Sequence, residues 1–213
     1  GAIVGIAVEI ANAGAEPALS FTTDPIKPTG NRLVVLAVYN TLNAGTALVP
    51  TSVTGGGMTT WTTTATLTKR TTDTTKRVTL YRSLQASTGA AAPVVITWGA
   101  NQDAVRWSIV EFYEVLTTGA NGANAIAQDD DAEGTSASPS VTLGSAITGG
   151  NATYGAFLTD ATGGITEGSG YTLLHDEPNA GELFTEFKAA GSTTVDCTVD
   201  SADATTVWAG VAI

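Results

Sequence analysis

Side chains with reactive chemistry are scarce in this sequence of 213 residues. It contains one cysteine, Cys197, and one histidine, His175. A single cysteine excludes an intrachain disulfide, and any Ser-His-Asp or Cys-His arrangement would have to use His175. One histidine and one distant cysteine also cannot fill a tetrahedral zinc site without several carboxylates. The sequence therefore predicts a protein that is not an enzyme and that needs no cofactor.

Basic residues and long apolar runs are scarce as well. Nine Lys and Arg stand against 20 Asp and Glu, which gives a net charge of −11 and a pI near 4.2. Nucleic-acid binding needs clustered basic residues, so it is not expected here. No stretch approaches the roughly 18 apolar residues of a membrane-spanning helix, and residues 1–10 lack the basic leader of a signal peptide.

Short segments rich in Thr, Val and Ala fill the chain instead, separated by glycine pairs. Residues 77–84 and 195–199 alternate polar and apolar side chains, which is typical of a strand with one buried face. No comparable stretch follows a helical period. More than ten such segments predict an all-β fold, an antiparallel two-sheet β-sandwich. No linker or internal repeat is evident, so residues 1–213 are expected to form a single domain.

The strands are expected at residues 3–10, 32–40, 48–54, 60–69, 76–84, 93–98, 104–116, 138–143, 153–160, 170–175, 182–189, 193–200 and 205–213. The most loop-like region is expected at residues 119–134. Cys197 lies between Val195 and Val199 on one strand face, the pattern of a small buried hydrophobe. His175 ends a strand before Asp176-Glu177-Pro178, which indicates a surface position.

Two of these strands are apolar on both faces, residues 33–39 and 104–115. Antiparallel strands of this kind need cover on both sides. The cover comes either from the chain itself or from another subunit, and the second alternative predicts a homo-oligomer. Interface side chains are then expected in the longest strand and in an N-terminal strand or arm within residues 1–18, namely Trp107, Ile109 and Tyr113, and Ile3, Val4, Ile6 and Val8.

One acidic segment offers a possible ion site. Asp129, Asp131 and Glu133 alternate before Gly134, as in the first half of a calcium loop. The twelfth position, where such a loop supplies a bidentate carboxylate, is Ser140. A solvated acidic loop without calcium is the alternative.

Two further patterns suggest ligands. Trp61 follows three glycines and a methionine, so its ring is a candidate platform for stacking on a sugar; packing in the core is the alternative. The glutamates Glu111, Glu114, Glu182 and Glu186 could pair across a cleft, as in sandwich-fold glycosidases, or simply lie on wet strand faces. A carbohydrate-binding module, extracellular or on a phage fibre, is therefore the alternative function.

The order of segments resembles β-sandwich proteins found among phage structural genes and bacterial surface proteins. The resemblance begins at Thr29-Gly30-Asn31-Arg32-Leu33-Val34-Val35, similar to a T-G-N-x-L-V-V opening. It continues through residues 53–62, 78–82, 107–115, 134–139, 168–174 and 186–188. These motifs are structural, and no catalytic residue comes with them.

This resemblance implies a jelly-roll-type accessory protein of a tailed-phage virion. The expected function is that of a capsid decoration protein, which binds the outer shell and stabilises it through subunit contacts. The expected partners are the major capsid protein, or another virion protein, and sister copies of the chain. The expected location is the capsid exterior.

Overall fold

The computed structural model describes residues 4–6, 17–64, 68–69, 74–147, 149–160, 163–176, 183–200 and 206–213. The all-β prediction is confirmed, since strands dominate these residues and the helix they contain is a short 3-10 turn, η1, at Ala120–Ala125. The strands are β1 (Val4–Ile6), β2 (Ala18–Ile26), β3 (Leu33–Thr41), β4 (Ser52–Gly55), β5 (Thr62–Thr63), β6 (Thr68–Lys69), β7 (Lys76–Leu84), β8 (Ala92–Gln102), β9 (Ala104–Phe112), β10 (Asp130–Thr135), β11 (Ser140–Thr142), β12 (Thr153–Thr159), β13 (Ile165–Glu167), β14 (Thr172–Asp176), β15 (Phe184–Lys188), β16 (Thr194–Val199) and β17 (Val207–Ala212).

Strands β1–β9 form the first half of the molecule. Its inner sheet has the order β1-β9-β3-β7-β5, with β6 pairing farther along β7, and its outer sheet has the order β2-β8-β4. All the pairings are antiparallel. The two sheets enclose a first core, which contains Val34, Leu36, Val38, Ile96, Trp98, Trp107 and Ile109.

Strands β10–β17 form the second half, and they repeat this arrangement. The inner sheet has the order β10-β17-β12-β15-β14 and the outer sheet β11-β16-β13. If β10 is matched to β1, β11 to β2, and so on, with β14 taking the place of the interrupted β5–β6 edge, the strand order is the same in both halves. Each half is thus an antiparallel two-sheet sandwich in which consecutive strands alternate between the sheets, as in a jelly roll, except at β5–β7 and at β14–β15, where consecutive strands share the inner sheet.

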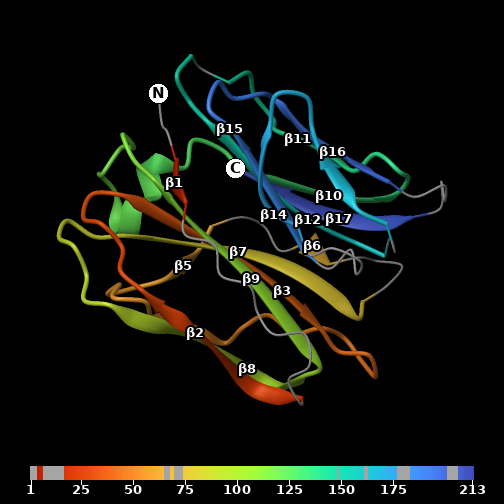
Figure 1. Ribbon diagram of the computed structural model, residues 1–213, viewed down its shortest axis with the longest axis horizontal. Helices are drawn as coiled ribbons and strands as arrows, with labels where there is room; N and C mark the ends of the chain where they lie inside the picture. Colours follow the sequence, from red (N-terminus) through yellow and green to blue (C-terminus); the bar gives the residue numbers. More distant parts are fainter. Residues whose placement is uncertain are drawn as a thin grey trace.

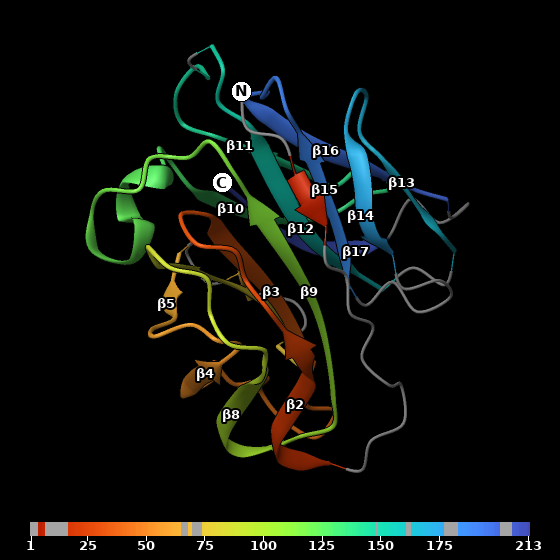
Figure 2. The ribbon, with the colours of Figure 1, turned by 60° about the vertical axis from the view of Figure 1, so that its left-hand side comes forward.

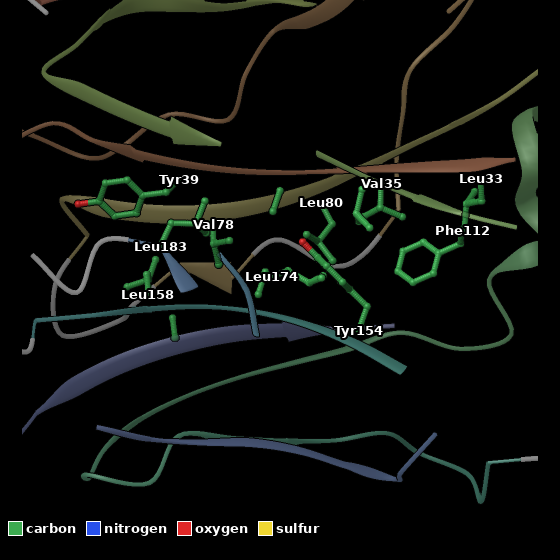
Figure 3. Close-up of a cluster of buried hydrophobic side chains, with 14 residues drawn as sticks. Leu33, Val35, Tyr39, Val78, Leu80, Phe112, Tyr154, Leu158, Leu174 and Leu183 are labelled. Carbon is green, nitrogen blue, oxygen red and sulfur yellow. The ribbon is translucent and has the colours of Figure 1, made fainter. Parts of the chain in front are cut away.

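The two halves are stacked through their inner sheets, so the molecule has four layers of sheet (Figures 1 and 2). Between the inner sheets lies a shared core, to which Leu33, Val35, Tyr39, Val78, Leu80 and Phe112 come from the first half. Tyr154, Leu158, Leu174 and Leu183 come from the second half and lie opposite them (Figure 3). A second core, with Val141, Phe157, Phe184, Val195 and Cys197, fills the second sandwich.

This stacking explains why some strands are apolar on both faces. Every residue of β3 and of β12 is buried. In β3, Leu33, Val35 and Ala37 face the shared core, while Val34, Leu36 and Val38 face the first core. The sequence indicated one sandwich over residues 1–213. The sheets instead form two sandwiches, and the core between them is made of side chains from both halves.

A few polar contacts accompany the shared core. Ser108 Oγ on β9 lies 3.1 Å from Thr185 Oγ1 on β15. At the margin, Lys76 Nζ lies 2.6 Å from Asp160 Oδ1. These contacts add directional interactions to the apolar packing, which alone has little directional preference.

Several strands differ from the expectation. β13 lies at residues 165–167, where no strand was expected, and the described part of the strand expected at residues 60–69 consists of the short strands β5 and β6. β10 begins inside the predicted loop at residues 119–134 and ends at Thr135, and it pairs along its whole length with β17. β2, which is not among the expected strands, continues through Pro25. Pro25 lacks an N–H, but β2 is an edge strand and its register shifts between Thr22 and Pro25, so the missing donor is tolerated.

Candidate functional site

A cavity of about 400 Å³ opens at one end of the shared core, beneath the segment that joins the two halves. This segment, residues 113–129, is called the connector here. The cavity is lined by the start of β3, the end of β9, part of the connector, Leu143, Ile147, residues 150–152, the start of β12 and Ile213. It is therefore formed where the two inner sheets separate and the connector crosses between them.

The deep wall of the cavity is apolar and aromatic. Leu33, Phe112 and Tyr154 belong both to this wall and to the shared core. The rings of Phe112 and Tyr154 meet edge to face, with centroids 6.0 Å apart. Leu33 and Phe112 lie at the end of the shared core nearest the connector (Figure 3). The cavity thus continues the dry interior outward to the surface.

Hydrogen bonds hold the connector to both halves. Asn121, with a left-handed φ of 52°, donates from Nδ2 to Thr62 Oγ1 and Arg82 O, and its Oδ1 accepts from Leu84 N. On the other side, Gln128 Nε2 donates to Ser145 O, while Ser145 N donates to Gln128 Oε1, both at 3.0 Å. The connector is therefore tied to both halves by hydrogen bonds beside the cavity.

Glu114 is the one charged side chain among the described lining residues. Its φ is +56°, and it is exposed. Left-handed backbone is strained for a residue other than Gly, Asn or Asp, at about 1–2 kcal/mol. A carboxylate is thus held at the cavity in a backbone conformation that glutamate rarely adopts.

The candidate calcium ligands lie on a strand rather than in a loop. Asp131 and Glu133 belong to β10, which Asp129 immediately precedes. Side chains two residues apart on a strand are about 7 Å apart, so their oxygens do not converge as they do in a calcium loop. No group of three or more His, Cys, Asp or Glu is placed to hold a metal ion in the described part of the chain. Burial and then the charges of Asp130, Asp129 and Glu133 raise the pKa of Asp131.

The expected interface residues of the longest strand differ in burial. Trp107 and Ile109, 5% and 2% exposed, pack in the first core under the outer sheet, so the chain itself covers them and they are not available to a partner. Tyr113 is half-buried, with the Arg32 guanidinium 5.7 Å from its ring centre, and its role stays a prediction.

The N-terminal segment supplies a strand to the chain's own sheet. Within Val4–Ile6, β1 pairs with β9, Val4 lying opposite Phe112 and Ile6 opposite Val110. Of the two alternatives for this segment, a first strand is therefore what the structure contains at these residues. Ile3 and Val8 lie outside the described residues.

Trp61 is half-buried against the first core. Its indole N–H donates to Gly55 O at 3.1 Å. This bond fixes the ring beside the glycine turn, where only part of its surface remains open. The structure therefore gives Trp61 a packing role, and a glycan contact stays a prediction.

The other candidate side chains serve the structure. Glu111 accepts from Thr29 N and pairs with Arg32, at 2.9 and 3.2 Å. His175, expected at the surface, is only 5% exposed on β14, because β14 is part of an inner sheet. Burial raises the pKa of the Cys197 thiol, which keeps it protonated and unreactive. Glu182 lies outside the described residues.

Glu186 is a fully buried carboxyl group in the second core. It accepts one hydrogen bond on Oε2, from Gly168 N at 2.9 Å, while Oε1 has no partner among the described residues. Burial, helped by the nearby charges of Asp196 and Glu167, raises the pKa of Glu186 to about 8, against the opposing effects of the Gly168 N–H and Lys188. At neutral pH this side chain is therefore mainly a neutral acid.

The cavity was not predicted from the sequence. Its lining comes from several segments that are far apart in the chain, and half of these residues are ordinary Ala, Ile and Leu. The connector was predicted only as the most loop-like region. The one sequence signal near the cavity was the pair Glu111 and Glu114 at the end of the longest strand, because Glu114 lines the cavity.

The described helix is too short and too polar to cross a membrane. No model of a known protein family matches the chain, and no curated protein or solved structure matches it either.

Proposed function

We propose that this protein is a non-enzymatic structural protein of a virion, most simply an accessory protein that decorates the outside of a phage capsid. The observation that carries the proposal is the shared core, which joins two sandwiches of the same strand order into one four-layered body. A body packed through its largest sheets is stiff, and stiffness is what a protein that reinforces a shell requires.

The motif that begins the resemblance has a structural role, which supports the proposal at the level of the fold. A Cβ on Gly30 would lie 2.6 Å from Ala86 O, so only glycine fits there. Asn31 follows with a left-handed φ of 59°, and Thr29 N donates to Glu111. The three residues thus turn the chain into β3, the central strand of the first half.

The chemically reactive side chains are also enclosed in the structure. His175, Cys197 and Glu186 are all buried within the second half. The outward faces of the two outer sheets carry mainly hydroxyl groups, such as Ser20, Thr22, Ser52 and Thr54 in the first half and Thr142, Thr166 and Thr198 in the second. Such faces suit contacts with other proteins through hydrogen bonds.

The proposal is tested by expressing the chain together with the major capsid protein encoded nearest to its gene. Sedimentation on a gradient should place the chain with assembled shells, and decorated shells should dissociate at a higher temperature than bare ones. Light scattering should also give a solution mass above the 21.5 kDa of one chain, as expected for a homo-oligomer. A chain that stays monomeric and never sediments with shells contradicts the proposal, and glycan-array binding lost in Trp61→Ala would favour the carbohydrate-binding alternative.

A further inference from the structure

The cavity under the connector has the size of a small-molecule site. Its volume of about 400 Å³ lies within the range of about 300–1,000 Å³ that ligand pockets occupy. An apolar cavity of about 150 Å³ already admits benzene, so this one has room for a longer apolar molecule. Leu33 and Phe112 form part of its deep wall, where the shared core begins (Figure 3). A molecule that enters the cavity therefore rests on side chains that are already packed.

Several polar side chains of the lining already have partners within the protein. Both ends of the Gln128 amide are used in hydrogen bonds to the Ser145 backbone, and the Asn124 amide donates to a threonine hydroxyl. The Thr153 hydroxyl lies 3.0 Å from a tyrosine hydroxyl. A polar ligand would therefore find few unused donors and acceptors here, and it would lose hydrogen bonds to water on entering.

The lining also gives little to a charged ligand. The described lining residues include no Lys, Arg, His or Asp. An anion would meet no cationic partner there, and the net charge of −11 on the chain would repel it. A cation would find only Glu114, which is exposed to water and already has an interaction within the protein. The cavity therefore favours a ligand without charge.

An exposed leucine carries the apolar wall to the surface. Of the large hydrophobic side chains that are exposed in the described part of the chain, Leu116 is the most exposed, at 65%, and it lines the cavity. Next to it in the connector, Val115 packs against the shared core. An apolar ligand that covers Leu116 removes this surface from water, which is favourable. The cavity thus has apolar side chains both at its deep wall and at its solvent-exposed edge.

We propose that this cavity binds a small neutral apolar molecule of the class of a medium-length alkyl chain. The chain lies between Leu116 at the surface and Leu33 and Phe112 at the deep wall, and a neutral polar end remains in water. Binding is driven by the apolar area that leaves water, and not by recognition of a head group. This site is independent of the virion proposal, since it concerns a ligand rather than an assembly partner.

The first test varies the length of the probe and then its charge. Calorimetric titration of the full chain compares butanol, hexanol and octanol, and each added CH₂ should tighten binding about fourfold, as expected for one buried methylene. The heat-capacity change of binding should be negative. Octylammonium and octanoate, measured in about 0.3 M salt to screen the net charge, should bind no more tightly than octanol. Binding that does not depend on chain length, or tighter binding of either ion, would overturn the proposal.

Two matched pairs of variants locate the site. Leu116→Ser should weaken octanol binding about three- to tenfold, whereas Leu173→Ser, at an exposed leucine outside the lining, should not. Ala125→Phe places a ring at a lining position that packs against the shared core and should abolish binding, whereas Ala120→Phe, an exposed position in the same connector outside the lining, should not. Because Leu116 is so exposed, Leu116→Ser should keep the melting temperature of the parent protein, and its result stands even if Ala125→Phe fails to fold. Unchanged octanol binding in Leu116→Ser, or no binding of octanol at millimolar concentration, would overturn the proposal.

Discussion

The two halves of the molecule share a strand order but fill their cores differently. The first core is packed with large side chains, among them Trp98, Trp107 and Tyr81. In the second half, Gly155 and Gly210 on the inner sheet leave room for the Phe157 ring, and a Cβ on either would come within 2.5 Å of a neighbouring side chain. The same arrangement of strands therefore accepts both a bulky core and one built around glycines.

The halves also treat buried polar groups differently. In the first half, Asn40 Nδ2 donates to Gln102 Oε1 at 2.7 Å, and Gln102 donates onward to two backbone carbonyls. In the second half, Glu186 accepts one hydrogen bond and is otherwise enclosed. Both halves leave some buried polar atoms without a hydrogen-bond partner among the described residues, Asn40 Oδ1 and Glu186 Oε1 among them, but only the Glu186 group can ionise, and it makes the surrounding core sensitive to pH. The second half should therefore respond more strongly to its environment.

The largest effect is expected from Trp107→Ala in the first core. Removing a buried indole leaves a cavity, which typically costs about 3–5 kcal/mol of unfolding free energy. Urea denaturation measures this loss, and Thr22→Ala on the exposed outer face serves as the control. Trp107→Ala could instead leave the stability intact and change the mass in solution. That result would mean that another subunit, and not the outer sheet, covers the face of β9 that carries Trp107.

In the second core, the matching test adds volume instead of removing it. A Cβ on Gly210 would lie 2.5 Å from Phe157 Cδ1 and 3.1 Å from Val141 Cγ2. Gly210→Val should therefore cost about 3 kcal/mol, the upper part of the usual range for overpacking. Gly144→Ala is the control, because nothing lies within 4 Å of its Cβ position. Tolerance of Gly210→Val would show that the second core repacks freely.

The third prediction concerns pH. The pKa of Glu186 is about 8 in the folded protein, above the 4.5 of an ordinary glutamate, so the folded state binds this proton more tightly than the unfolded state. Its contribution to stability is complete below pH 4.5 and is lost as the pH rises towards 8. Between pH 5.5 and 7.5 the loss should be about 2 kcal/mol.

Hydrogen exchange measured by mass spectrometry can assign this loss to a half. Protection should fall with rising pH in β12, β15 and β16 more than in β3 and β9, once the intrinsic exchange rates are corrected. Glu186→Gln should flatten the pH dependence, while Glu111→Gln, in the first half, should not. An unchanged slope in Glu186→Gln would contradict the assignment.

The smallest effect is expected at the margin between the halves. Lys76 and Asp160 lie 2.6 Å apart but are 22% and 36% exposed, so solvent screens the pair. Lys76→Gln should cost about 0.5 kcal/mol, and 0.5 M salt should remove most of the difference. A double-mutant cycle with Asp160→Asn measures the coupling. A value well above 1 kcal/mol would mean that charge pairing, and not the shared core, sets how the halves meet.

Much of the fold could be predicted from local patterns. The strand expected at residues 76–84 is β7, with both bounds as predicted, and the doubly apolar residues 33–39 correctly indicated cover on both sides. β10 could not be predicted, because Asp and Gly are poor strand formers and its pairing with β17 comes from far along the chain. Local propensity says little where a distant partner provides the hydrogen bonds.

The duplication was hidden for a related reason. The matched central strands read LVVLAVYNT in β3 and TYGAFLT in β12, which share burial but little sequence. Only the order of strands in the sheets is repeated, and strand order depends on pairings between residues that are far apart. The cavity was hidden in the same way, since Leu33, Glu114 and Tyr154 meet only when the two inner sheets are stacked.

The shared core has a practical consequence for anyone who wishes to divide this protein. A fragment that ended within the connector would carry Leu33, Val35, Leu80 and Phe112 on a naked surface, with water where the other sandwich should be. Such a fragment should aggregate or dimerise through that surface. The two halves are therefore not expected to be stable when they are expressed and purified separately.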